Sequence, residues 1–168
     1  MWSSRLIVAV LAALLLHGCG FRPLYGNSGD GDRVSRALAQ IRVETIADRT
    51  GQKLRNFLLD RLNPAGQPSQ PLYSLRVTTS VSRTDLGIQR DETATRAVLV
   101  LTAQFNLLDA AGKTVLVEGS MQSTNGLNIL DSDFATLSSE TDAIDRAARE
   151  VSDDIRTRLA LYFSGGKS

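Results

Sequence analysis

The chain has one cysteine, Cys19, and one histidine, His17, and both lie at the end of an apolar N-terminal run. A cysteine thiol can act as a nucleophile, and imidazole is the commonest general acid or base in enzymes. Neither group occurs after residue 19. The rest of the chain therefore has no Ser-His-Asp or Cys-His catalytic site and no zinc site built from His or Cys.

The N-terminal run is typical of a secretory signal, because Arg5 precedes uninterrupted apolar residues over 6–16. A membrane-spanning helix needs about 20 apolar residues, so the run is too short for a permanent span. The sequence Leu16-x-Gly18-Cys19 resembles the lipobox of bacterial lipoproteins, in which the signal is cut before the cysteine and the cysteine carries the lipid. This resemblance predicts a signal peptide over 1–18 and a covalent acyl lipid, such as palmitate, on Cys19. The alternative is an ordinary cysteine after a secretory signal.

The residue after the cysteine bears on location. In bacterial lipoproteins an aspartate there often retains the protein in the inner membrane, and here it is Gly20. The resemblance therefore favours the outer membrane.

The charge balance argues against nucleic acid as a partner. The chain has 19 Lys and Arg against 18 Asp and Glu, and removal of 1–18 takes away only Arg5. No basic surplus remains to bind phosphates along a nucleic acid. Asp131 and Asp133, in an expected loop, are a weak candidate for ligand binding, and we predict no catalytic site, metal site or cofactor apart from the lipid.

Apolar periodicity predicts the elements that follow the lipid anchor. Alternation predicts strands over 40–47, 72–83, 93–108 and 114–123. Helical spacing predicts helices over 54–62, with Thr50 as a possible cap, and over 138–162. Residues 86–91 and 125–135 are expected to be turns or loops.

The predicted order β-α-β-β-β-α indicates an α/β (α+β) fold: a two-layer sandwich with two helices packed on one face of a mainly antiparallel four-stranded sheet. We expect a lipidated tether over 19–36, a single domain over 37–163 and a disordered tail over 164–168. The second face of the sheet is rich in Ser, Thr, Gln and Asn and holds few charges.

The start of the expected mature chain carries a more specific likeness. The stretch Cys19-Gly20-Phe21-Arg22-Pro23-Leu24-Tyr25 resembles the beginning of the LptE family of lipopolysaccharide-assembly lipoproteins. The likeness extends to residues 56–58, to 131–135 and to the last helix.

The resemblance implies a non-enzymatic outer-membrane lipoprotein that plugs the β-barrel protein LptD, assists its assembly and takes part in inserting lipopolysaccharide into the outer leaflet. It places the protein on the periplasmic side and in the barrel lumen. The alternative is a stand-alone lipoprotein that binds a solute or serves another envelope transporter. A glycan-cleaving enzyme that uses carboxylates is a third hypothesis.

Lipid A carries phosphates, and the arginine fork suits phosphate. Arg83, Arg90 and Arg96 are therefore candidates for lipopolysaccharide contact. The competing interpretation pairs these arginines with Asp85, Asp91 or Glu92 on the surface.

Overall fold

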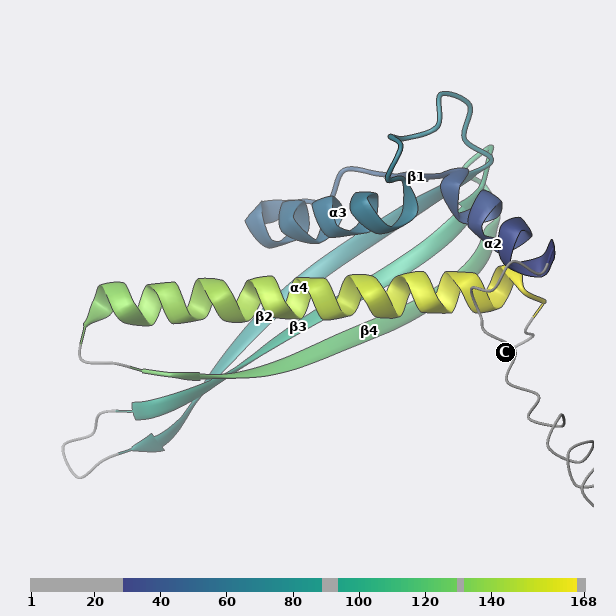
Figure 1. The fold of residues 1–168 in the computed structure, drawn as a ribbon. Coiled ribbons are helices and arrows are strands. Elements are labelled where there is room, and N and C mark those ends of the chain that lie inside the picture. Colours follow the sequence, from purple (N-terminus) through teal and green to yellow (C-terminus); the bar gives the residue numbers. More distant parts are fainter. Residues whose placement is uncertain (1–28, 89–93, 130–131, 166–168) are drawn as a thin grey trace, which may run out of the picture.

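The computed structural model describes residues 29–88, 94–129 and 132–165. In these parts the chain forms one sheet in the order β1-β2-β3-β4, covered on one side by helices (Figure 1). β1 is parallel to β2, and the other neighbours are antiparallel. The predicted α+β sandwich with a mainly antiparallel sheet is therefore confirmed. The elements are α2 (Gly29–Ala39), β1 (Ile41–Val43), α3 (Asp48–Leu62), β2 (Tyr73–Ile88), β3 (Ala94–Asp109), β4 (Val115–Asn128) and α4 (Asp133–Phe163).

The core lies between the sheet and the helices. Alternate side chains of β3 point into it, and Leu99, Leu101, Phe105 and Leu107 are almost completely buried. Each such side chain contributes about 1.5–3 kcal/mol when removed from water. The intervening residues point to the other face of the sheet because strand side chains alternate. The apolar alternation in the sequence thus selects the face that the helices cover.

Helix α4 is the longest element and packs along the sheet over β3 and β4. Its buried stripe includes Ala147, Val151, Ile155 and Leu159, which recur at helical spacing. The Ser132 side chain accepts a hydrogen bond from the Ala135 backbone N–H at 3.5 Å, as an N-cap residue does.

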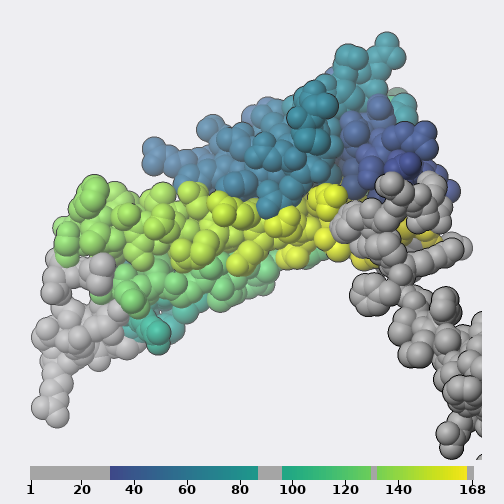
Figure 2. All heavy atoms as spheres, viewed as in Figure 1, coloured from purple at the N-terminus to yellow at the C-terminus, as the bar shows by residue number. Residues whose placement is uncertain are grey.

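Helices α3 and α4 run parallel and side by side (Figure 2). Two ion pairs join them: Lys53 Nζ lies 2.5 Å from Asp145 Oδ1, and Arg61 pairs with Asp153. In both pairs the two partners lie 92 residues apart in the sequence. The two helices therefore run in the same direction, and each residue of α3 lies beside the α4 residue 92 positions later. The pairs thereby fix how far α3 is shifted along α4.

Helix α3 begins earlier than the sequence predicted. It starts at Asp48 after Ala47, and no side-chain hydrogen bond caps it, so the expected cap at Thr50 is wrong. Gly51 is buried within its first turns, where an added Cβ would lie 2.5 Å from Ile46 Cγ2. The glycine permits close packing of the helix on Ile46.

A third helix occupies residues that were expected to form part of the tether. Helix α2 spans Gly29–Ala39, at the end of the molecule where α4 finishes (Figure 1). Leu38 is 3% exposed, and Val34, one turn earlier, packs against the core. The ordered domain thus begins by Gly29, before the expected residue 37. Glycine and aspartate obscured this short helix because they disfavour helices in isolation.

Several other boundaries also differ from the expectation. Strand β1 is confined to three residues of the expected 40–47, and β2 continues through Ile88, into the expected turn. Strand β4 continues through Asn128 and α4 begins at Asp133, so most of the expected loop is regular structure. Polar β4 residues are held in the strand by pairing, as in Thr124 opposite Val100.

None of the helices in the described ranges has the length and apolarity needed to cross a membrane.

Candidate interaction surface

The sheet face that points away from the helices, here called the open face, is a broad polar surface. It consists of the outward side chains of β2, β3 and β4, and central members are Thr78, Ser80, Thr102, Gln104, Gln122 and Thr124. The last strand is exposed at most of these positions. A face of hydroxyl and amide groups can dock on another polar surface through hydrogen bonds.

The charges of the open face lie near its ends. Near β1, Glu44 accepts hydrogen bonds from Ser74 Oγ at 2.7 Å and from Arg76 Nε at 3.1 Å. The Ser74 hydroxyl, followed by Arg76, lowers the pKa of the Glu44 carboxyl. Glu118 lies toward the same end and Arg96 toward the other.

The middle of the open face is uncharged. Between these ends, the outward positions of the described strands are Ser, Thr, Gln, Gly and Val. Such a surface can be desolvated against hydrogen-bonding partners without burying an ion.

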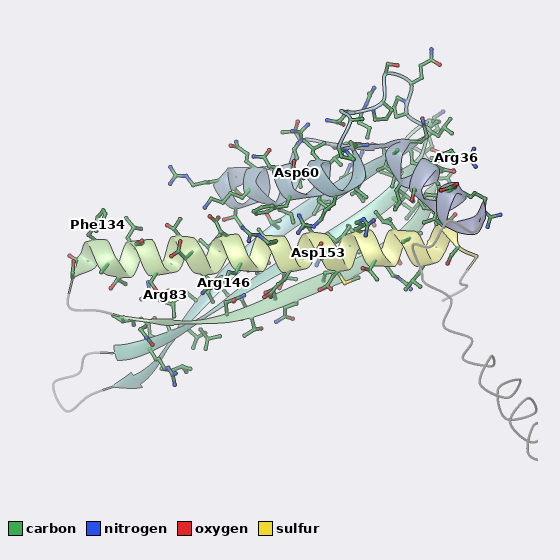
Figure 3. All side chains as sticks on the ribbon, in the orientation of Figure 1. Arg36, Asp60, Arg83, Phe134, Arg146 and Asp153 are labelled. Atoms are coloured by element: carbon green, nitrogen blue, oxygen red, sulfur yellow. The ribbon has the colours of Figure 1, made fainter. Side chains whose placement is uncertain are left out.

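The far end of the molecule, here called the distal end, comprises the last residues of β2 and β4, the first residues of β3 and the start of α4. Arg83 lies there on the inner face of the sheet, where Nε donates to Asp85 Oδ1 at 2.9 Å and Nη1 donates to Glu140 Oε2 at 3.0 Å (Figure 3). The Asp85 hydrogen bond is the main cause that raises the Arg83 pKa. Arg83 therefore joins β2 to α4, and the ion-pair interpretation holds for it.

The structure places the other predicted site residues differently. Arg96 is exposed on the open face, opposite Leu86 on β2 and Asn128 on β4. Arg90 and Cys19 lie outside the described residues. Asp131 also lies outside them, whereas Asp133 is the first residue of α4. The described residues hold no group of three His, Cys, Asp or Glu side chains suited to a metal ion.

Two strongly exposed apolar residues of α4, at the distal end, were not singled out as site residues. Phe134, in the first turn of α4, is 81% exposed (Figure 3), and Leu137, one turn later, is 63% exposed. Two large apolar side chains left in water at one end suggest a contact surface. The sequence did offer a signal for Phe134, because this residue lies in the stretch 131–135 that resembles the LptE family. We expected that stretch to be a loop, however, and so did not predict that Phe134 lies exposed on a helix.

The seam between α3 and α4 is charged but has a structural role. Arg61 Nη2 donates to Asp153 Oδ2 at 2.8 Å, and the guanidinium carbons of Arg61 and Arg149 lie 5.6 Å and 5.2 Å from the centre of the Phe57 ring. The Arg61 hydrogen bond lowers the pKa of Asp153 despite partial burial. These contacts hold two helices together.

Comparison with known structures supports the fold. A candidate lipoprotein of Caulobacter crescentus is 26% identical, with a TM-score of 0.66 over 82% of this chain and 99% of that one. The rare lipoprotein B of Shewanella oneidensis is 12% identical, with a TM-score of 0.53 over 73% of this chain and 94% of that one. The Shewanella likeness shows the fold alone.

Sequence comparison extends the likeness over nearly the whole chain. An uncharacterised protein of Rickettsia prowazekii is 23% identical over 154 residues, which cover 92% of this chain and 94% of that protein. The family model described as LptE, lipopolysaccharide-assembly, matches residues 38–159, from the end of α2 to the last turns of α4. The chain therefore belongs to the LptE lipopolysaccharide-assembly family.

Proposed function

We propose that this protein is an outer-membrane lipoprotein, anchored through Cys19, that plugs and assists assembly of the LptD β-barrel. In this role it takes part in inserting lipopolysaccharide into the outer leaflet. It is not an enzyme, and it works by filling space and gripping its neighbour. The observation that carries the proposal is the family match over residues 38–159.

The open face supports the role of a plug. The lumen of a wide outer-membrane barrel is polar, so a plug must present polar groups to the wall. The middle of the open face offers hydroxyl and amide groups, such as Ser80, Thr102 and Gln122, and no charge that would need a matched partner. Hydrogen bonds between such surfaces offset their loss of water.

The distal end supports lipopolysaccharide contact. Arg96 is exposed there, and Phe134 and Leu137 on α4 offer apolar surface at the same end. A guanidinium suits a lipid A phosphate, and apolar side chains suit acyl chains. Arg83 contributes less directly because Asp85 and Glu140 already occupy its guanidinium.

The first test is affinity purification of the full-length chain from detergent-solubilised membranes of its own organism. The proposed role predicts that LptD elutes with the chain in equal molar amounts. A chain that elutes without LptD contradicts the proposed role. Elution with subunits of a different envelope transporter would establish the auxiliary-subunit alternative instead.

A second measurement addresses lipopolysaccharide. Arg96→Glu reverses the exposed charge at the distal end, so we expect weaker binding of purified lipopolysaccharide. Arg76→Glu is the control, because Arg76 lies on the same face at the opposite end. Equal affinity of the wild type and Arg96→Glu would remove Arg96 from the proposed contact.

A further inference from the structure

The exposed edge of β4 lacks the features that usually protect an edge strand. β4 is the last strand of the sheet, so one side of its backbone faces outward. Natural edge strands are guarded by charged side chains, proline, short length or a covering segment. β4 has 14 residues, and the run 119–128 contains no charge and no proline. The other side of its backbone pairs with β3 along the strand.

The opposite edge of the same sheet is protected. β1 pairs with the first residues of β2, from Tyr73 to Leu75. Farther along β2, Arg83 and Asp85 point to the inner face, and inward-pointing charges are a known way to discourage strand pairing. On the inner face of β4, Ser123 donates a hydrogen bond to Glu150 and Asn125 accepts one from Arg146, both charged residues of α4. β4 itself has no charged residue over 119–128, and this contrast favours β4 as the edge for a partner.

Gly126 is a second, independent observation on β4. A Cβ added there would meet no atom within 4 Å, and its φ is not in the positive range. Nothing in the described part of the chain thus requires glycine at this position. Gly119 on the same strand is different, because a Cβ there would lie 2.8 Å from the Phe105 ring. The missing Cβ of Gly126 faces the open side of the sheet, opposite Val98, so another chain can approach the open face closely beside the edge.

We propose that β4 pairs, along residues 119–128, with an extended uncharged segment of the barrel partner. This inference rests on the proposed function, because it takes its partner from there. The unpaired N–H and C=O groups of an edge are complementary to a β-strand. The wall strands of a closed barrel are already paired with one another, so the segment is a loop or terminus that enters the lumen.

Side chains beside β4 define the chemistry of that segment. Gln122 and Thr124 on the open face favour hydroxyl or amide neighbours across the strand pair. Glu118, one residue before the run, favours a basic residue just beyond the end of the uncharged segment. The open face continues onto this edge, so face and edge form one contact surface.

The test compares two lysine substitutions in the same detergent purification of the full-length chain. Gln122→Lys places a guard charge on the edge strand, and Gln104→Lys places the same charge on β3 at the centre of the same face. Both glutamines are exposed. We expect Gln122→Lys to lower the LptD recovered per chain about tenfold, which corresponds to about 1.4 kcal/mol, and Gln104→Lys to lower it much less.

Gly126→Val is the second variant. Valine favours a strand, and its side chain would stand on the open face, out of the plane in which strands pair. Strand pairing therefore predicts that thermal stability is unchanged or higher and that LptD recovery is retained. A stable Gly126→Val chain that loses LptD would assign the contact to the open face and overturn strand pairing. If Gly126→Val does not fold, the pair of lysine variants decides.

Other results of the same experiments distinguish strand pairing from its alternatives. Equal loss in Gln122→Lys and Gln104→Lys assigns the contact to the open face and overturns strand pairing. A wild-type chain that sediments as a dimer, with Gln122→Lys restoring the monomer, assigns the edge to a second copy and also overturns it. A wild-type chain without LptD contradicts the proposed function itself, whereas retention by all variants contradicts only the edge inference.

Discussion

Asp153 illustrates how one surface carboxylate couples the two long helices. Its hydrogen bonds from Arg61 lower its pKa below the ordinary value of 3.8, although its side chain is 59% exposed. A lowered carboxyl pKa stabilises the fold above the ordinary pKa, and this stability is lost as pH falls through the folded-state pKa. Exposure limits the effect to less than about 1 kcal/mol.

We therefore expect Asp153→Asn to lower the free energy of unfolding at pH 6, by less than about 1 kcal/mol. The difference from the wild type should shrink as the pH falls below 3.8 and through the lowered folded-state pKa of Asp153. Urea denaturation of both proteins over this pH range measures the difference in their free energies of unfolding. Asp154→Asn is the matched control, because it removes a neighbouring carboxylate that has no ion pair among the described residues. A pH-independent difference would show that the Arg61 contact is not its cause.

The contacts of individual site residues were the feature that the sequence predicted least well. The arginine fork suggested Arg83 as a phosphate ligand, but Glu140, 57 residues later in the chain, binds it. A pairing between a strand and a distant helix depends on the tertiary arrangement and has no local signal. The neighbouring Asp85 was recognised as a possible partner because it lies two positions along the same face of the strand.

At the scale of elements, α4 has two parts with different roles. Leu159 is completely buried, whereas Leu137 at the start of the helix is 63% exposed. The ion-pair register between α3 and α4 places the first residue of α3, Asp48, beside residue 140. The first two turns of α4 therefore extend beyond α3, which leaves Phe134 and Leu137 uncovered.

This division predicts unequal effects from the same substitution. Leu159→Ala should lower the free energy of unfolding by about 2–5 kcal/mol because it leaves a cavity. Leu137→Ala should change it by less than about 0.5 kcal/mol because the side chain already meets water. Chemical denaturation compares the two directly. A loss of several kcal/mol in Leu137→Ala would mean that the start of α4 is packed, and would remove it as a contact surface.

Periodicity in the sequence predicted the sheet, α3 and α4, because each has a long apolar repeat. It missed α2, which has only Leu38 buried and Val34 beside it, too few apolar positions to establish a helical period. It ended β4 early because Asn125 and Gly126 are typical of turns, although pairing with β3 keeps them in the strand. Tertiary contacts decided both cases.

At the scale of the whole molecule, the two faces of the sheet differ in what covers them. The helices and the inner face of the sheet form the core, and the helices leave the open face uncovered (Figure 1). Composition had indicated this division, since the second face of the predicted sheet was polar with few charges. Periodicity could predict neither the partner nor the lipid on Cys19, because neither a barrel nor an acyl chain leaves a periodic pattern in the sequence of the domain.

The most direct test of the central claim is native mass spectrometry of the affinity-purified protein released from detergent. The account predicts a complex of one barrel and one chain, in which the chain begins at Cys19 and carries the added mass of its acyl groups. A monomeric chain with an unmodified thiol and no barrel would contradict it.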